Sequence, residues 1–259
     1  MAQVLGVIPA RLKSSRLPEK VLLAETGKPL IQHVYEAAAK AKKIDTLIVA
    51  TDDQRVVDAC SSFGAKAVLT SDKCASGTDR VSEAAQSFPE AEIVLNIQGD
   101  EPEMDAGVLD ALVAGMLKAD AKVEMGTVVT PWPDDIDIQT PGCVKVVCDR
   151  EGCALYFSRS PIPHIRDEAA EAEVKKQNGG VLPFKRHIGL YAYRASFLQQ
   201  FASMPPSALE LAESLEQLRA LESGAKIVVV DVEYSGLEVN TAEDYAGFVK
   251  RRAEHGERG

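Results

Sequence analysis

Residues 4–20 decide the fold, and they read Val-Leu-Gly-Val-Ile-Pro-Ala-Arg-Leu-Lys-Ser-Ser-Arg-Leu-Pro-Glu-Lys. The apolar run over residues 4–9 ends at a proline and predicts a buried first strand. The loop that follows gathers four cations and two serine hydroxyls within ten positions: Arg11, Lys13, Arg16, Lys20, Ser14 and Ser15.

This loop has the position and the charge of a phosphate-binding segment. In parallel α/β sheets, ligands bind beyond the carboxyl ends of the strands. Cations at that edge would neutralise a triphosphate and stabilise the charge of its transition state. A solvated basic loop is the alternative, but the position directly after the first strand favours a phosphate site. The loop is not a G-x-x-x-x-G-K-[ST] sequence, which argues against a P-loop NTPase.

Strand and helix patterns alternate through the first part of the chain. Apolar runs predict buried strands at residues 46–51, 66–70 and 93–97. Helical patterns lie at residues 28–43, from Asp52 to Gly64, and at residues 76–87, with Asp52 as the expected N-cap of the second. This alternation predicts right-handed crossovers and a mainly parallel sheet.

The second part of the chain is richer in β-type runs. They predict strands at residues 123–130, 144–148, 153–157, 187–193 and 227–232. Helices are predicted at residues 207–221 and 241–252. Residues 161–183 contain three prolines, two glycines and many charges, and we expect them to form a mobile insertion or an arm.

Composition limits the possible partners and the compartment. The chain has 259 residues, of which 46% are hydrophobic, and a net charge of −10. An acidic protein lacks the basic surface that nucleic acids and anionic membranes require, so we expect neither as a partner. We expect a cytoplasmic protein, since no secretory signal and no membrane-length apolar run occurs. The five cysteines are an odd number without a C-x-x-C pair, which predicts reduced structural thiols.

The segment Ile-Pro-Ala-Arg-x-x-Ser-x-Arg-Leu-Pro-x-Lys at residues 8–20 resembles the signature of the sugar-activating cytidylyltransferases of the Kdo (3-deoxy-manno-octulosonate) family. Further segments resemble that family's blocks in the same order. They lie at residues 49–52, 76–80, 96–102, 144–147, 154–163, 186–193 and 215–219. The resemblance covers about residues 3 to 250, and so many blocks in one order make it specific.

The resemblance implies a reaction and a fold. CMP would pass from CTP to Kdo or a close analogue for lipopolysaccharide biosynthesis, with Mg²⁺ as cofactor and pyrophosphate as the second product. The fold would be a single three-layer, Rossmann-like α/β domain over residues 1–255, with a mixed, mainly parallel sheet. A β-rich part over about residues 122–194 would serve sugar binding and dimerisation, so a homodimer is expected.

The resemblance also assigns roles at the nucleotide end. Arg11, Lys20 and Asp100 would be catalytic, with the two cations on the phosphates and Asp100 on the metal. Without the resemblance, Asp100 could be a turn residue. Residues 76–80 open a helix whose N–H groups suit a polar ligand, and by resemblance they and Arg80 would recognise cytosine. The complete nucleotide set would be Pro9, Ala10, Arg11, Arg16, Lys20, Ser76, Gly77, Thr78, Arg80 and Gln98.

A second set of residues would bind the acidic sugar: Arg159, His187, Tyr191, Glu216 and Gln217. Arg159 follows a predicted strand, and its planar fork matches the carboxylate of such a sugar. His187 and Tyr191 are four apart in a strand and should share a face. A satisfied core histidine and a solvated helix face remain the alternatives for His187 and for the Glu216–Gln217 pair.

One position departs from the family pattern. The usual Val-Asp-Thr-x-Glu-Asp block supplies a metal-binding aspartate, but residues 239–244 here read Val-Asn-Thr-Ala-Glu-Asp. Asn240 would therefore be a neutral second metal ligand beside Asp100, and it should hold Mg²⁺ more weakly. Two other functions stay open: activation of another acidic sugar such as 8-amino-Kdo or sialic acid, and nucleotide binding without catalysis.

Overall fold

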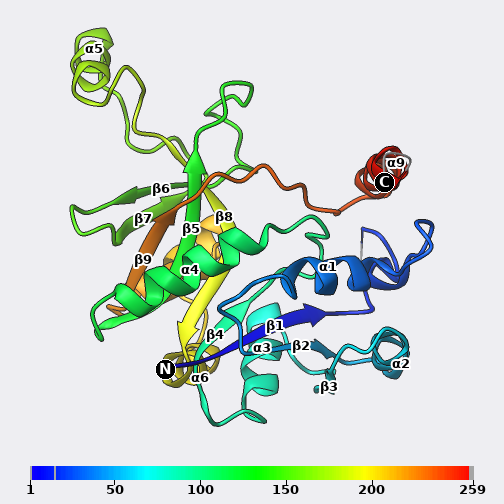
Figure 1. Cartoon of the computed structure of the whole chain (residues 1–259). Helices are drawn as coiled ribbons and strands as arrows, with labels where there is room; N and C mark the ends of the chain where they lie inside the picture. The colour runs from blue at the N-terminus through cyan, green and yellow to red at the C-terminus, as the bar shows by residue number, and fades with distance from the viewer. Residues whose placement is uncertain (1, 15, 257–259) are drawn as a thin grey trace.

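The computed structural model describes residues 2–14 and 16–256 and is built around one twisted sheet (Figure 1). The sheet runs in the order β3-β2-β1-β4-β8-β5-β9, and β8 is antiparallel to both of its neighbours. These strands are β1 (Gln3–Ala10), β2 (Thr46–Thr51), β3 (Ala67–Leu69), β4 (Ala91–Asn96), β5 (Val123–Pro131), β8 (Lys185–Arg194) and β9 (Lys226–Asp231). The predicted mixed sheet, with the parallel pairings of an α/β fold, is confirmed.

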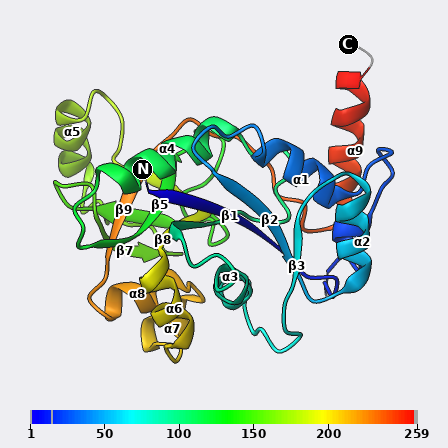
Figure 2. The ribbon, with the colours of Figure 1, turned by 60° about the horizontal axis from the view of Figure 1, so that its bottom comes forward.

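Helices cover both faces of the sheet, which gives three layers (Figure 2). One face carries α1 (Leu30–Ala38), α2 (Gln54–Ser62) and α4 (Ala106–Lys118), and the other carries α3 (Gly77–Ala85), α6 (Ala195–Ser203) and α8 (Gln217–Glu222). Ile31 and Leu112 are fully buried on the first face, and Val81, Phe201 and Leu218 on the second. Each such side chain contributes roughly 1.5–3 kcal/mol of burial free energy, so the three-layer arrangement follows from the apolar runs.

The helices α4 and α6 lie where the sequence predicts none. The α4 segment is apolar on nearly every side and contains two glycines, so it shows no polar stripe to mark a helix. The α6 segment begins at the residue after β8, and no turn sequence separates the two elements.

The predicted helix over residues 207–221 is wrong as a single element. It is divided into α7 (Ala208–Glu213) and α8, because Ser214 adopts the left-handed backbone conformation with φ of 52°. The predicted cap of α2 is wrong by one residue. Asp53 accepts the Arg55 N–H and caps this helix, while Asp52 pairs with Arg80 at 3.1 Å.

The β-rich part forms a hairpin and an arm. Strands β6 (Lys145–Cys148) and β7 (Ala154–Ser158) pair with each other, and β6 also pairs with β8. The expected arm contains α5 (Glu168–Gln177), which extends away from the body of the molecule (Figure 1) and buries none of its side chains.

A long connector brings the end of the chain back to the carboxyl edge of the sheet. After β9 the chain crosses to the α1 side and forms α9 (Ala242–Gly256). Leu30, Val239, Tyr245 and Phe248 form a small core there. The Val239 N–H donates to the Asp100 carbonyl at 2.8 Å, so residues 239–240 lie directly beside the end of β4. Within residues 2–14 and 16–256, none of the helices has both the length and the apolar character needed to cross a membrane.

Candidate active site

A pocket opens where β1 and β4 end. Its volume is about 280 Å³, and it is lined by Pro9, Arg11, Lys13, Ser14, Arg16, Lys20, Val21, Gly77, Gln98, Gly99 and Asp100. The basic loop, the start of α3 and the end of β4 therefore meet at one edge of the sheet, as the topology rule predicts. Lys13 and Ser14 of the predicted phosphate-binding loop line the pocket, and so do Val21 and Gly99, which the prediction omits. Ser15, also of that loop, lies outside the described residues.

Gly99 allows the two loops to touch. A Cβ atom at this position would lie 2.6 Å from the Pro9 carbonyl oxygen, which is backbone and cannot move aside easily. Only glycine lets backbone segments approach so closely. Gln98 also lines the pocket, and its Nε2 donates to the Gly189 carbonyl at 2.7 Å, which ties the end of β4 to β8.

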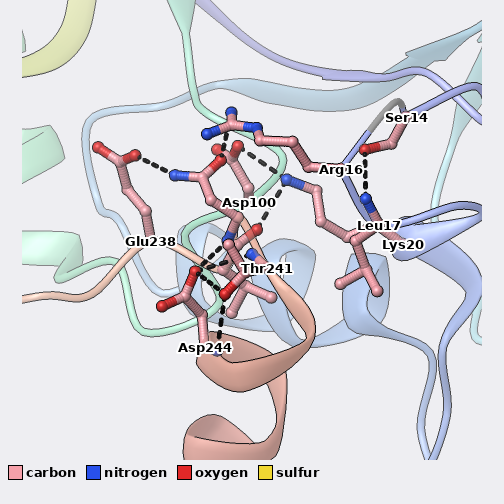
Figure 3. A network of polar contacts seen from close by, with 10 residues as sticks. Ser14, Arg16, Leu17, Lys20, Asp100, Glu238, Thr241 and Asp244 are labelled. Carbon is pink, nitrogen blue, oxygen red and sulfur yellow. Dashed lines mark hydrogen bonds and ion pairs between the residues drawn. The ribbon is translucent and has the colours of Figure 1, made fainter.

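Residues that line the pocket take part in a network of polar contacts with the segment before α9 (Figure 3). Lys20 Nζ donates to Asp100 Oδ2 at 3.0 Å and to the Val239 carbonyl at 2.7 Å. Arg16 Nη2 donates to Asn240 Oδ1 at 3.0 Å, so both predicted metal ligands carry a cation as partner. The Val239–Asp100 backbone hydrogen bond brings the segment that carries Asn240 next to Asp100, which lines the pocket.

Arg11 supplies a donor that is ready for a ligand. Its Nη2 is buried and has no hydrogen-bond partner among the residues described. A buried, unpaired donor of a charged group is costly, and an anion in the pocket would satisfy it. Together with Lys13, Arg16 and Lys20 it makes a positive pocket in a chain of net charge −10.

At the start of α3, the side chains predicted to recognise cytosine make hydrogen bonds within the protein. Ser76 caps the helix reciprocally with Asp79, so its hydroxyl oxygen accepts from the Asp79 N–H. The Arg80 side chain is only 1% exposed, and its two terminal nitrogens donate to Thr70 and Asp52. Arg80 therefore braces the segment from behind, and its Nε has no partner in the described structure.

Two other predicted nucleotide residues also face away from the pocket. The Ala10 methyl group is fully buried in the core. Thr78 is 3% exposed and donates to Glu216 Oε2 at 2.7 Å. A buried alanine and a paired hydroxyl can offer only their backbone groups to a nucleotide. The alternation of side chains along β1 could have predicted from sequence that Ala10 points into the core. No local signal predicts the Thr78 contact, because it joins residues far apart in the chain.

The predicted sugar residues cluster next to α8. The His187 ring lies 5.5 Å from the Tyr191 ring, which confirms that they share a face, and 5.0 Å from that of Phe157. The Tyr191 hydroxyl donates to Gln217 Oε1 at 3.0 Å, while Gln217 Nε2 is buried without a partner in the part of the chain described. Burial lowers the pKa of His187 to about 3, so the ring is neutral and can share a proton only through hydrogen bonds such as that to Thr127.

Arg159 already uses three of its guanidinium N–H groups for hydrogen bonds within the protein. Its Nε, Nη1 and Nη2 donate to the carbonyls of Glu213, Pro141 and Ser214 at 2.6, 2.9 and 3.2 Å. A guanidinium has five N–H groups, so each terminal nitrogen keeps one donor for a ligand. Arg159 thus holds two loops together and retains a reduced capacity for a carboxylate.

Glu101 is a buried acid that the predicted site omits. It is 2% exposed, accepts from the Tyr234 hydroxyl at 2.6 Å and lies beside Asp100. Burial raises the pKa of Glu101 to about 7. The sequence Gln-Gly-Asp-Glu-Pro at residues 98–102 indicates Asp100 as the functional acid. It does not predict the burial of Glu101, because Tyr234, which contacts Glu101, lies on the connector after β9.

Comparison with known proteins agrees with this architecture. A family model for cytidylyltransferases matches residues 5–227. The 3-deoxy-manno-octulosonate cytidylyltransferase of Synechococcus elongatus is 48% identical over 244 residues, which are 94% of this chain and 96% of that protein. The chain belongs to the 3-deoxy-manno-octulosonate cytidylyltransferase family. The family member from Geobacter metallireducens is 44% identical over 249 residues, covering 96% of this chain and 97% of its own.

Solved structures support the same family assignment. A CMP:2-keto-3-deoxy-manno-octonic acid synthetase complexed with CTP matches over 100% of both chains with a TM-score of 0.86 and 39% identity. A cytidylyltransferase from Leptospira borgpetersenii matches 96% of this chain and 86% of its own, with a TM-score of 0.62 and 16% identity, which shows the fold alone. Membership of this family confirms the resemblance and makes the chain a nucleotidyltransferase.

Proposed function

We propose that this enzyme transfers CMP from CTP to Kdo and releases pyrophosphate. The observation that supports this most is the pocket at the ends of β1 and β4, which is lined by four cations and Asp100. The buried Arg11 Nη2, which has no partner among the described residues, would be satisfied by an anion there. The relatives' names supply the nucleotide and the sugar. The anomeric 2-hydroxyl of the sugar attacks the α-phosphorus, an O–P bond forms, the bond to the β-phosphate oxygen breaks and the hydroxyl loses its proton.

The residues contribute by position and charge. Arg11, Arg16 and Lys20 hold the triphosphate and offset the charge that moves to pyrophosphate. Gly99 lets the nucleotide lie close to the backbone of both loops. On the sugar side, the neutral His187 and the unpaired Gln217 Nε2 offer hydrogen bonds to hydroxyl groups, and Arg159 offers its remaining donors to the carboxylate.

The side-chain oxygens of Asp100 and Asn240 are ligands of the type that Mg²⁺ prefers. Within the described part of the chain, no group of three or more His, Cys, Asp or Glu side chains is arranged to hold a metal ion. Mg²⁺ needs less than that, since it commonly binds one or two carboxylates together with substrate phosphates. Asp100 would be the charged ligand and Asn240 the neutral one. When bound, the ion would neutralise phosphate charge and lower the pKa of the sugar hydroxyl.

We further propose a cytoplasmic homodimer that serves lipopolysaccharide biosynthesis. CTP is a cytoplasmic substrate, and the activated sugar suits a later glycosyl transfer. For the dimer, the β6–β7 hairpin and α7 expose large apolar side chains: Leu155 is 61% and Leu211 69% exposed. Ser158 of β7 donates to Glu213 of α7 at 2.6 Å, so the two elements are joined. Light scattering with Leu155→Glu tests this part.

One assay tests the main proposal. Pyrophosphate release is measured with CTP, UTP, ATP and GTP, each offered Kdo, 8-amino-Kdo and N-acetylneuraminate. Release with CTP and Kdo, far above every other nucleotide, is the expected result. Greater activity with 8-amino-Kdo would favour the second candidate function, activation of that sugar. Asn240 makes this candidate physically reasonable, because it removes the negative charge of the aspartate that the family pattern has at this position. No release with any pair would support a binding protein instead.

A further inference from the structure

Two consecutive residues at the start of α8 make hydrogen bonds to different halves of the candidate site. Glu216 Oε2 accepts from the Thr78 hydroxyl at 2.7 Å, on the nucleotide side. Gln217 Oε1 accepts from the Tyr191 hydroxyl at 3.0 Å, on the sugar side. A single peptide bond therefore separates contacts that belong to the two halves of the site.

This junction is sheltered and firmly anchored. Thr78 is 3% exposed and Gln217 1% exposed, while Leu215 and Leu218 on either side of the pair are 7% and 0% exposed. A hydrogen bond to a charged acceptor is stronger where water is excluded, and its loss leaves the acceptor unpaired. Leu215 and Leu218 anchor α8 to the core, and the Thr78–Glu216 hydrogen bond links its first turn to α3.

On the nucleotide side, the junction begins at the pocket wall. Gly77 lines the pocket and precedes Thr78 in the first turn of α3. A Cβ at Gly77 would lie 3.7 Å from Pro9, which shows how closely this turn faces the loop after β1. A nucleotide held between these segments would restrict the turn that carries the Thr78 hydroxyl.

On the sugar side, the junction ends at a donor with no partner. Gln217 Nε2 is buried and makes no hydrogen bond to the described residues. Tyr191 occupies the amide oxygen and thereby fixes the plane in which this N–H group points. A substrate oxygen would satisfy it, as buried polar groups require.

We propose that the Thr78–Glu216 hydrogen bond couples nucleotide binding to sugar binding, with both residues acting as positioning residues. A nucleotide against Gly77 steadies Thr78, Thr78 holds Glu216, and Glu216 positions the backbone turn from which Gln217 presents its donor. This inference rests on the proposed function, since it needs CTP and an acidic sugar in the two halves. Coupling of this kind is reciprocal, so each substrate tightens binding of the other.

Calorimetry with an unreactive CTP analogue tests the coupling. The analogue carries a methylene group between its α- and β-phosphates, and Kdo is titrated into the enzyme with and without it. We expect the analogue to tighten Kdo binding roughly tenfold in the wild type, a coupling of about 1.4 kcal/mol. In Thr78→Val, which removes the donor at nearly constant volume, the gain should fall below about threefold, and Thr78→Ser should restore it.

Two further variants separate coupling from simple structural support. Glu216→Ala should lower the gain by the same factor, and the double variant should lose no more than either single variant. Thr46→Val at the opposite end of the strands is the matched control and should keep the full gain. If Thr78→Val fails to fold, the Glu216→Ala and Thr78→Ser pair carries the comparison.

The outcomes distinguish this inference from the proposed function. A wild type that releases pyrophosphate but shows no coupling, or a Thr78→Val enzyme with the full gain, overturns the link and leaves the function intact. Additive losses in the double variant overturn it as well. A wild type without pyrophosphate release from any pair overturns both.

Discussion

Asn240→Asp tests the metal site through a pair of contacts that the structure defines. Asn240 Oδ1 accepts from Arg16 at 3.0 Å, and its Nδ2 donates to a Glu238 carboxylate oxygen at 2.7 Å. The substitution preserves the first contact because an aspartate oxygen accepts equally well. It replaces the second donor by an oxygen, so two carboxylates then face each other where a donor and an acceptor now pair.

The size of the effect follows from that geometry. Two like charges about 4 Å apart repel by roughly 1 kcal/mol in water and roughly 4 kcal/mol at an effective dielectric constant of 20. Glu238 is exposed, so the lower end of this range applies. A divalent cation between Asp100 and the new carboxylate relieves this repulsion. Metal affinity should therefore rise by about 1–2 kcal/mol, or roughly 5- to 30-fold.

The measurement is a rate titration against Mg²⁺ for wild type and variant, with Kdo and with 8-amino-Kdo. The half-saturating Mg²⁺ concentration should fall roughly tenfold with both sugars, and Mg²⁺ should raise the unfolding temperature of the variant more than that of the wild type. Glu238→Gln in the variant background should restore stability without metal. If the half-saturating Mg²⁺ concentration stays the same but the preference between the two sugars changes, Asn240 belongs to the sugar site. No change in either quantity would mean that Asn240 is only a helix-entry residue before Thr241 and α9.

Three other substitutions test the remaining roles. Asp100→Ala should lower kcat by about 100-fold or more while shifting the unfolding temperature little, because the residue lies at a strand end and is 27% exposed; thermal scans beside the rate assay check both. Arg159→Ala should raise the KM for the sugar roughly tenfold, with the KM for CTP nearly unchanged, because it frees two loops and removes the remaining donors; equal increases in both KM values would assign Arg159 to general stability. His187→Phe should flatten the pH dependence of stability. The folded pKa of His187, about 3, lies below the unfolded value of 6.5, so the unfolded state binds more protons between these values and the wild type loses up to about 1.4 kcal/mol per pH unit as the pH falls. Urea unfolding at several pH values measures this slope, and Tyr191→Phe, which has no titration in that window, is the control.

The nucleotide end was predictable from sequence because it follows from local order. Each parallel strand ends at the same edge, so the loop after β1 and the turn after β4 had to meet. Lys20 and Asp100 are therefore paired as the topology requires, at 3.0 Å. The helix α4 was missed for a local reason too, since its nearly uniform apolar surface hides the helical period.

The sugar end was less predictable because its contacts join elements far apart in the chain. The residue types were indicated by resemblance, but the partners of Arg159 and Thr78 depend on the break at Ser214, which no turn sequence announces. Likewise, the exchange of roles between Asp52 and Asp53 depends on Arg80, a residue of a different helix. Tertiary partners of this kind override local capping preferences.

The two ends of the site therefore hold their ligands by different physical means, with different consequences for specificity. The phosphate end relies on long cationic side chains such as Lys20 and Arg16, whose attraction depends on charge more than on direction. The sugar end relies on buried donors whose directions are fixed by neighbours, as Tyr191 fixes the Gln217 amide. A directed, buried donor rejects a ligand that leaves it unpaired, whereas a charge attracts any phosphate chain. Discrimination between acidic sugars should therefore reside in the first turn of α8 and in β8, and the strength of nucleotide binding in the loop after β1.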